Sequence, residues 1–124
     1  MSRRILVTGA RGFLGRYSVE ALGADGWQVF GTGRRRPDLD GLVSSYAADL
    51  MNPPETEQLL AKAKSDTLLH LAWVNDPGRG MDAHENNDWV DASLNLARAF
   101  ADAGGRRIVF GSSCAVYDLS LIHI

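Results

Sequence analysis

The sequence has a single cysteine, Cys114, among its 124 residues. One cysteine excludes a disulfide within the chain, and together with the lack of a recognisable signal peptide it predicts a reducing, cytoplasmic location. No apolar run approaches the roughly 20 residues that a membrane-spanning helix needs, so we expect no membrane association. The formal net charge of -2 gives no electrostatic case for binding nucleic acid.

Histidine is also scarce, and its three copies lie far apart in the sequence. No cysteine and histidine have the spacing of a zinc site, so the sequence predicts no metal. No serine, histidine and acidic residue have the spacing of a hydrolase triad, and Cys114 is not a candidate nucleophile. The length fits one domain and no more.

The most informative segment runs from Ile5 to Gly15 and reads Ile-Leu-Val-Thr-Gly-Ala-Arg-Gly-Phe-Leu-Gly. Residues typical of a buried strand are followed by three glycines at a spacing of three, and then by the periodicity of a helix. Such a turn points backbone N–H groups and the positive end of the helix dipole at one place, which suits a pyrophosphate. Gly9 permits the turn, Gly12 lets the backbone approach phosphate, and Gly15 lets helix and strand pack closely. No Gly-Lys-Ser/Thr follows, which excludes a P-loop.

Strand and helix patterns alternate along the chain, which predicts an α/β fold with a parallel sheet and helices on both faces. Five strands are expected, within residues 5–8, 27–32, 43–47, 67–72 and 106–111. Two further helices are expected over 53–64 and 87–103, and polar loops over 33–41 and 76–86. The prediction is a doubly wound, Rossmann-type sheet with strand order 3-2-1-4-5 and the ligand at its carboxyl edge.

Each expected helix has an apolar stripe, the face that should pack on the sheet. In the first helix the stripe is Phe13, Leu14, Tyr17, Ala21 and Leu22. In the other two it is Leu59, Leu60 and Ala63, and Val90, Leu94, Ala97 and Phe100. The second helix also has a strong start signal, because Asn52 is a good cap, Pro53 suits the first helical position and Glu55 completes a capping box.

A cluster of arginines stands where a dinucleotide-binding fold meets the adenosine ribose, about twenty positions past the glycines. Arg34 directly follows the second expected strand, and Arg35 and Arg36 come next. A guanidinium pairs with phosphate through charge-assisted hydrogen bonds, so the cluster favours NADP over NAD. The alternative is that all three side chains are simply solvated on a surface loop.

The spacing Thr-Gly-x-x-Gly-x-x-Gly resembles that of the short-chain dehydrogenase/reductase superfamily, particularly its extended branch of nucleotide-sugar epimerases, dehydratases and reductases. The resemblance assigns cofactor contacts to the turn and the helix start, namely Thr8, Gly9, Arg11, Gly12, Phe13, Leu14 and Gly15. A basic residue at the position of Arg11 is frequent among members that use NADP, which strengthens that preference.

Two further pairs resemble cofactor-binding elements of the extended branch. Asp49 and Leu50 resemble an Asp-Leu pair whose carboxylate receives the adenine amino group, although an isolated aspartate at a strand end is usually a turn residue. His70-Leu71-Ala72-Trp73 resembles a His-Leu-Ala-Ala segment that borders the cofactor, so Leu71 and Ala72 are expected in the site. His70 itself is expected to point into the sheet as a structural residue.

The segment Ser112 to Tyr117 resembles the family's Ser-Ser-x-x-Val-Tyr motif. The resemblance makes Ser113 the catalytic residue that hydrogen-bonds the substrate's carbonyl or hydroxyl, a role that a hydroxyl suits because it can donate or accept. The alternative is that the two serines only end the fifth expected strand and have a structural role. Trp89 stands where the family usually has an asparagine, so no role is carried over to it.

The family's catalytic Tyr-x-x-x-Lys pair, which supplies the proton, is absent from this sequence. Residues 1–118 are therefore expected to be the N-terminal part of an NAD(P)-binding domain, and 119–124 a non-native tail, and the 124-residue chain alone is expected to be inactive. The intact parent is expected to be an NADP-dependent epimerase, dehydratase or reductase acting on a nucleotide-linked sugar, and a homodimer is compatible with it. The alternative is a non-catalytic NADP-binding sensor or scaffold.

Overall fold

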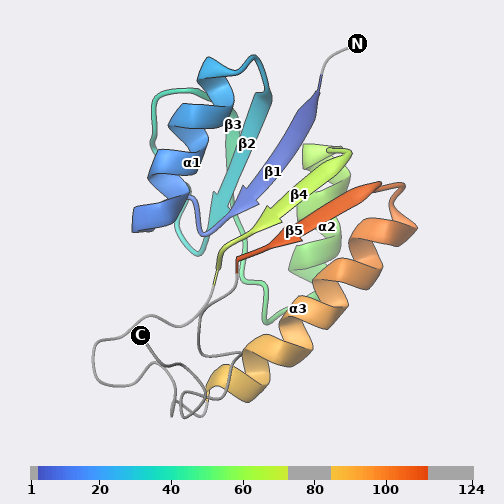
Figure 1. The fold of residues 1–124 in the computed structure, drawn as a ribbon. Coiled ribbons are helices and arrows are strands. Elements are labelled where there is room, and N and C mark those ends of the chain that lie inside the picture. The colour runs from blue at the N-terminus through green and yellow to red at the C-terminus, as the bar shows by residue number, and fades with distance from the viewer. Residues whose placement is uncertain (1–2, 73–84, 112–124) are drawn as a thin grey trace, which may run out of the picture.

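The chain folds around one parallel sheet of five strands, shown in Figure 1. The structure is a computed structural model that describes residues 3–72 and 85–111. The strands are β1 (Arg4–Thr8), β2 (Gln28–Gly33), β3 (Leu42–Ala47), β4 (Thr67–His70) and β5 (Arg107–Phe110). Their spatial order is β3-β2-β1-β4-β5, which confirms the predicted Rossmann-type topology.

Helices cover both faces of the sheet (Figure 1). The first, α1 (Phe13–Ala24), packs on one face, while α2 (Pro53–Ala63) and α3 (Glu85–Asp102) pack on the other. The helix α3 begins at Glu85, inside the segment expected to be a loop, and most of the rest of that loop lies outside the described residues. Within residues 3–72 and 85–111, no helix combines the length and the apolar character required to cross a membrane.

The central strands are apolar on both sides, as expected for a parallel sheet between two helical layers. In β1, Leu6 belongs to the cluster under α2 and α3, while Ile5 and Val7 belong to the cluster under α1. All three side chains are buried, and each contributes about 1.5–3 kcal/mol by leaving water. The predicted inward face of α2 is confirmed, because its buried residues include Leu59, Leu60 and Ala63.

The predicted inward face of α1 is wrong except for Leu22, which is half-buried and packs against the cluster under α1. Phe13, Leu14 and Tyr17 are exposed, and so is Ala21, whereas the buried residues of α1 are Gly15 and Val19. The reason is the close approach of helix and strand, since a Cβ atom on Gly15 would overlap the Gly9 carbonyl oxygen. The first turns of α1 therefore have no room for a side chain at Gly15, and Phe13, Leu14 and Tyr17 lie on the exposed face.

The predicted stripe of α3 is also wrong in part. Phe100 is buried as expected, but Val90 and Leu94 are about half exposed. The buried stripe is instead Ala92, Ser93, Leu96 and Phe100. Both stripes have helical spacing, and the polar Ser93 is accommodated on the inner one because it hydrogen-bonds a buried histidine of β4, described below.

The carboxyl ends of four strands are in register. Thr8 of β1 pairs with Thr32 of β2 on one side and with His70 of β4 on the other, and His70 pairs in turn with Phe110 of β5. In Figure 1 the strand arrows converge on the point where α1 begins. Residues far apart in sequence therefore meet at this edge, the carboxyl edge, where the ligand of a doubly wound fold binds.

Candidate nucleotide-binding site

The turn between β1 and α1 is tightly packed against the residues that follow β4. Gly9 has φ +66°, and a Cβ atom there would lie 2.9 Å from both Ala72 N and Leu71 C. The Gly12 amide donates to the Gly9 carbonyl at 3.0 Å, which closes the turn. A left-handed residue with neighbours this close has to be glycine, because a side chain would be both strained and obstructed.

The start of α1 is open. Gly12 caps the helix in an extended conformation without any side-chain hydrogen bond, and no acidic residue lies in the first turn. Among the described residues, a Cβ atom on Gly12 would meet within 4 Å only the Gly9 carbonyl oxygen, at 3.3 Å. The side chains of Phe13 and Leu14 in the first turn are exposed. The backbone N–H groups and the positive end of the helix dipole can therefore receive an anion here.

Two of the predicted basic residues lie close to each other at the end of β2. The Arg11 side chain extends over Gly33, since a Cβ atom on Gly33 would be 3.9 Å from Arg11 Cδ, and Arg34 comes next in the chain. Within residues 3–72 and 85–111, neither Arg11 nor Arg34 has an ion pair or a hydrogen bond. Arg36 differs, because its Nε donates to Ser45 Oγ of β3 at 3.1 Å. The free positive charge of this edge therefore includes Arg11 and Arg34.

Asp49 and Leu50, which follow β3, have different surroundings. Leu50 is buried in the core under α2 and α3, so only its backbone can face a ligand. Asp49 is half-buried, and its carboxylate accepts the Met51 amide at 3.0 Å in a local turn. The turn role of Asp49 is therefore real, but a carboxylate has further acceptor sites that remain for a ligand.

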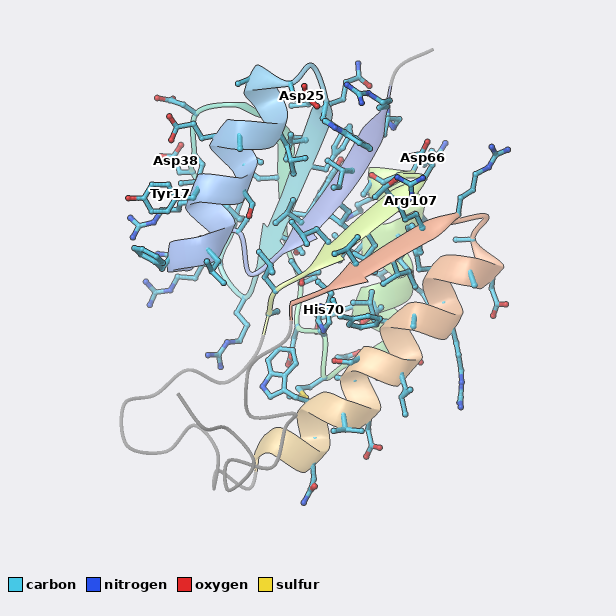
Figure 2. All side chains as sticks on the ribbon, viewed as in Figure 1. Tyr17, Asp25, Asp38, Asp66, His70 and Arg107 are labelled. Carbon is cyan, nitrogen blue, oxygen red and sulfur yellow. The ribbon has the colours of Figure 1, made fainter. Side chains whose placement is uncertain are left out.

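A buried hydrogen-bonded chain lies directly behind the turn. Thr8 Oγ1 is 2.7 Å from His70 Nδ1, and His70 Nε2 is 2.8 Å from Ser93 Oγ. Figure 2 places His70 at the carboxyl edge, far from Asp25 and Asp66 at the opposite edge. Burial lowers the pKa of His70 to about 4, so the imidazole is neutral near pH 7. As expected, His70 points inward.

Sequence reasoning assigned no role to Ser93. The available signal was its position one residue after Ala92 and three before Leu96, on the alternative apolar stripe of α3, where a lone polar side chain needs a buried partner. The predicted catalytic residue Ser113 lies outside the described residues. Among the described residues, no group of three or more His, Cys, Asp or Glu side chains could hold a metal ion.

Known proteins match this chain along most of its length. It is 39% identical over 111 residues to an uncharacterized protein of Mycobacterium tuberculosis, which covers 89% of this chain and 12% of that protein. It is 31% identical over 137 aligned residues to UDP-glucose 4-epimerase of Neisseria meningitidis serogroup C, which covers 93% of this chain and 38% of the epimerase. The chain therefore spans well under half the length of these relatives.

A solved structure and a family model agree with these matches. The crystal structure of UDP-glucose-4-epimerase from Stenotrophomonas maltophila, with bound NAD and formylated UDP-arabinopyranose, superposes with a TM-score of 0.76 at 25% identity. The superposition covers 93% of this chain and 38% of that one. The model of the NAD dependent epimerase/dehydratase family matches residues 5–121. Because that match includes nearly the whole sequence, the chain belongs to the NAD dependent epimerase/dehydratase family.

Proposed function

We propose that this chain is the NADP-binding part of an enzyme that transfers a hydride between the nicotinamide and a nucleotide-linked sugar. The observation that carries the proposal is the start of α1, open among the residues that the structure describes, beside two guanidinium groups that have no partner among the same residues. An uncompensated helix N-terminus and adjacent positive charge are favourable to a ligand that carries several phosphates.

The residues of the site fit a dinucleotide. Backbone N–H groups from Phe13 to Gly15 would hold the pyrophosphate, and the bare Gly12 leaves room for it to approach. The free acceptor sites of Asp49 would receive the adenine amino group. Leu71 and Ala72, packed against Gly9, would form the wall of the site toward the nicotinamide half.

The preference for NADP is supported by the charges at the end of β2. Arg11 and Arg34 come from separate segments: the Arg11 side chain lies near Gly33, and Arg34 follows Gly33 in the chain, where the adenosine ribose of such folds lies. An acidic residue at this place would accept a ribose 2′-hydroxyl and repel a 2′-phosphate, whereas a guanidinium attracts the phosphate. Solved structures of similar proteins contain NAD, including the Stenotrophomonas maltophila epimerase. The positive charge at the end of β2 is the feature by which this chain would differ from a protein that binds NAD.

The dinucleotide, when bound, supplies the hydride donor or acceptor. The chain's own residues bind and orient it, and Ser113 would hydrogen-bond the reacting oxygen of the substrate. A proton must also move when an alcohol is oxidised, and none of Tyr17, Tyr46 and Tyr117 is followed four positions later by lysine. We therefore expect the 124-residue chain alone to bind cofactor and to turn over no substrate.

Isothermal titration calorimetry with NADPH and NADH tests the proposal. The chain is expected to bind both dinucleotides, with NADPH bound more tightly. Adenosine 2′,5′-bisphosphate, which carries the 2′-phosphate without the nicotinamide, is expected to compete with NADPH. The absence of binding by either dinucleotide would contradict the proposed function, and equal affinities would contradict the preference for NADP.

A further inference from the structure

His70 has a hydrogen-bond partner at both ring nitrogens although it is almost fully buried. Only 4% of the residue is exposed. Thr8 lies at one nitrogen and Ser93 at the other. The ring of Phe110 packs edge-on against the imidazole, with 5.6 Å between the ring centroids. Two strands and one helix therefore meet at a single imidazole.

The hydrogen bonds of Thr8 decide which nitrogen of His70 carries the proton. Thr8 Oγ1 accepts the Leu71 amide at 3.0 Å and the Ala72 amide at 3.1 Å. A hydroxyl oxygen has two lone pairs, and both are used, so its own proton must be donated to His70 Nδ1. The proton of the neutral imidazole is therefore on Nε2, which donates to Ser93 Oγ. The other tautomer would direct a third N–H at the same Thr8 oxygen.

The two amides that Thr8 holds belong to the proposed wall of the dinucleotide site. The Leu71–Ala72 backbone is packed so closely on Gly9 that even a Cβ atom there would be 2.9 Å from Ala72 N. A small displacement of this backbone would therefore also move the turn that precedes the open start of α1.

We propose that Ser93 is a positioning residue for the dinucleotide site. By accepting the hydrogen bond from Nε2 it holds the imidazole where Nδ1 can receive the Thr8 hydroxyl proton, which leaves both lone pairs of Thr8 Oγ1 to the Leu71 and Ala72 amides beside Gly9. This inference rests on the proposed function for its ligand, although the hydrogen-bonded chain itself is a property of the protein without ligand.

The test combines nitrogen-15 NMR of the histidine rings with NADPH affinity, in the 124-residue chain and four variants. Ser93→Ala removes the acceptor, Ser93→Thr retains a hydroxyl, and Ser18→Ala is the matched control, a half-buried helical serine in α1. His70→Gln assigns the signal. In the unmodified chain the His70 signal is expected to show a protonated Nε2 and a bare Nδ1.

Ser93→Ala is expected to shift the His70 Nε2 signal, because its N–H loses its acceptor, and the Leu71 and Ala72 amide signals, and to weaken NADPH binding about tenfold. Ser93→Thr is expected to restore both, and Ser18→Ala to change neither. If Ser93 acted through packing alone, restoring its hydroxyl in Ser93→Thr would not restore the Leu71 and Ala72 amide signals or the NADPH affinity.

Three results would overturn the inference. One is a protonated Nδ1 in the unmodified chain, which can be read even if Ser93→Ala does not fold. The second is unchanged Leu71 and Ala72 amide signals and unchanged NADPH affinity in Ser93→Ala, and the third is failure of Ser93→Thr to restore a lost affinity. If the unmodified chain binds no NADPH, the proposed function fails by itself, while the ring and amide signals still decide whether Ser93 sets the position of this backbone.

Discussion

The starts of α1 and α2 differ in their capping, because α2 has a side-chain cap and α1 has none. At α2, the Asn52 side chain accepts the Glu55 amide at 3.3 Å, and the Glu55 carboxylate accepts the Asp49 amide at 3.2 Å. At α1 the cap is Gly12, without a side-chain hydrogen bond and without an acidic residue in the first turn. Both helices follow a strand of the same parallel sheet, so the difference lies in the residues and not in the topology.

This difference separates stability from binding. A side-chain cap stabilises a helix by about 1 kcal/mol, a contribution that α2 receives and α1 lacks. The amides left unsatisfied at α1 are those that a phosphate can occupy. Substitutions at the two starts should therefore have separable effects, on ligand affinity at α1 and on unfolding at α2.

The largest expected effect is at α1. Gly12→Val should abolish dinucleotide binding, because the added methyl groups occupy the space in front of the helix amides. The fold should persist, since Gly12 has a φ of -73° that any residue adopts. Calorimetry with NADPH and thermal unfolding measure the two effects. Gly23→Ala in the same helix is the control and should bind normally; unchanged affinity in Gly12→Val would count against the site.

The wall beside the open helix start depends on a neutral His70. Because its pKa is about 4 when folded and 6.5 when unfolded, the unfolded chain binds the extra proton between these values. Stability from this group is thus complete above about pH 6.5 and falls as the pH is lowered toward 4, by roughly 3 kcal/mol in total. Urea unfolding at several pH values measures the slope. His70→Gln should lose the part of the pH dependence that comes from this imidazole. An identical slope in that variant would show that His70 is not its source.

The arginines beside the open start should set cofactor preference. Arg34→Ala should reduce the preference for NADPH over NADH by about 1–3 kcal/mol, because a charge-assisted hydrogen bond to the 2′-phosphate is lost. Competitive calorimetry with both dinucleotides gives the difference. Arg107→Ala, at the opposite edge of the sheet in Figure 2, removes an equally exposed arginine and should leave the preference intact. If Arg34→Ala kept the full preference for NADPH, residues other than Arg34 would determine it.

The smallest expected effect is at α2. Asn52→Ala should lower the free energy of unfolding by about 1 kcal/mol, through loss of the cap to the Glu55 amide. NADPH affinity should not change, whereas Gly12→Val should change the affinity and preserve the fold. Denaturant unfolding and calorimetry on the same preparation provide both numbers. A loss of affinity comparable to that of Gly12→Val would show that the two helix starts are not independent.

The strand order and the glycine turn could be predicted because local patterns determine them. Alternating strand and helix periods led to the sheet order, and the capping signal at Asn52 led to the start of α2. Both depend on residues near one another in sequence, which is where pattern reasoning is strong.

The orientation of two helices could not be predicted in the same way. In α1 the close approach at Gly15 puts small residues inside, although Phe13 and Tyr17 are the larger apolar side chains. In α3 the choice between two apolar stripes depended on a hydrogen bond between Ser93 and His70, which are 23 residues apart in sequence. Contacts between distant segments decide such cases, and a single sequence does not display them.

The central claim is that the open start of α1 receives the phosphates, and amide NMR during an NADPH titration tests it most directly. We expect the largest shifts at the Phe13, Leu14 and Gly15 amides, and little change at the Glu55 and Thr56 amides of α2, which already have acceptors. Comparable shifts at both helix starts, or shifts confined to residues away from α1, would contradict it.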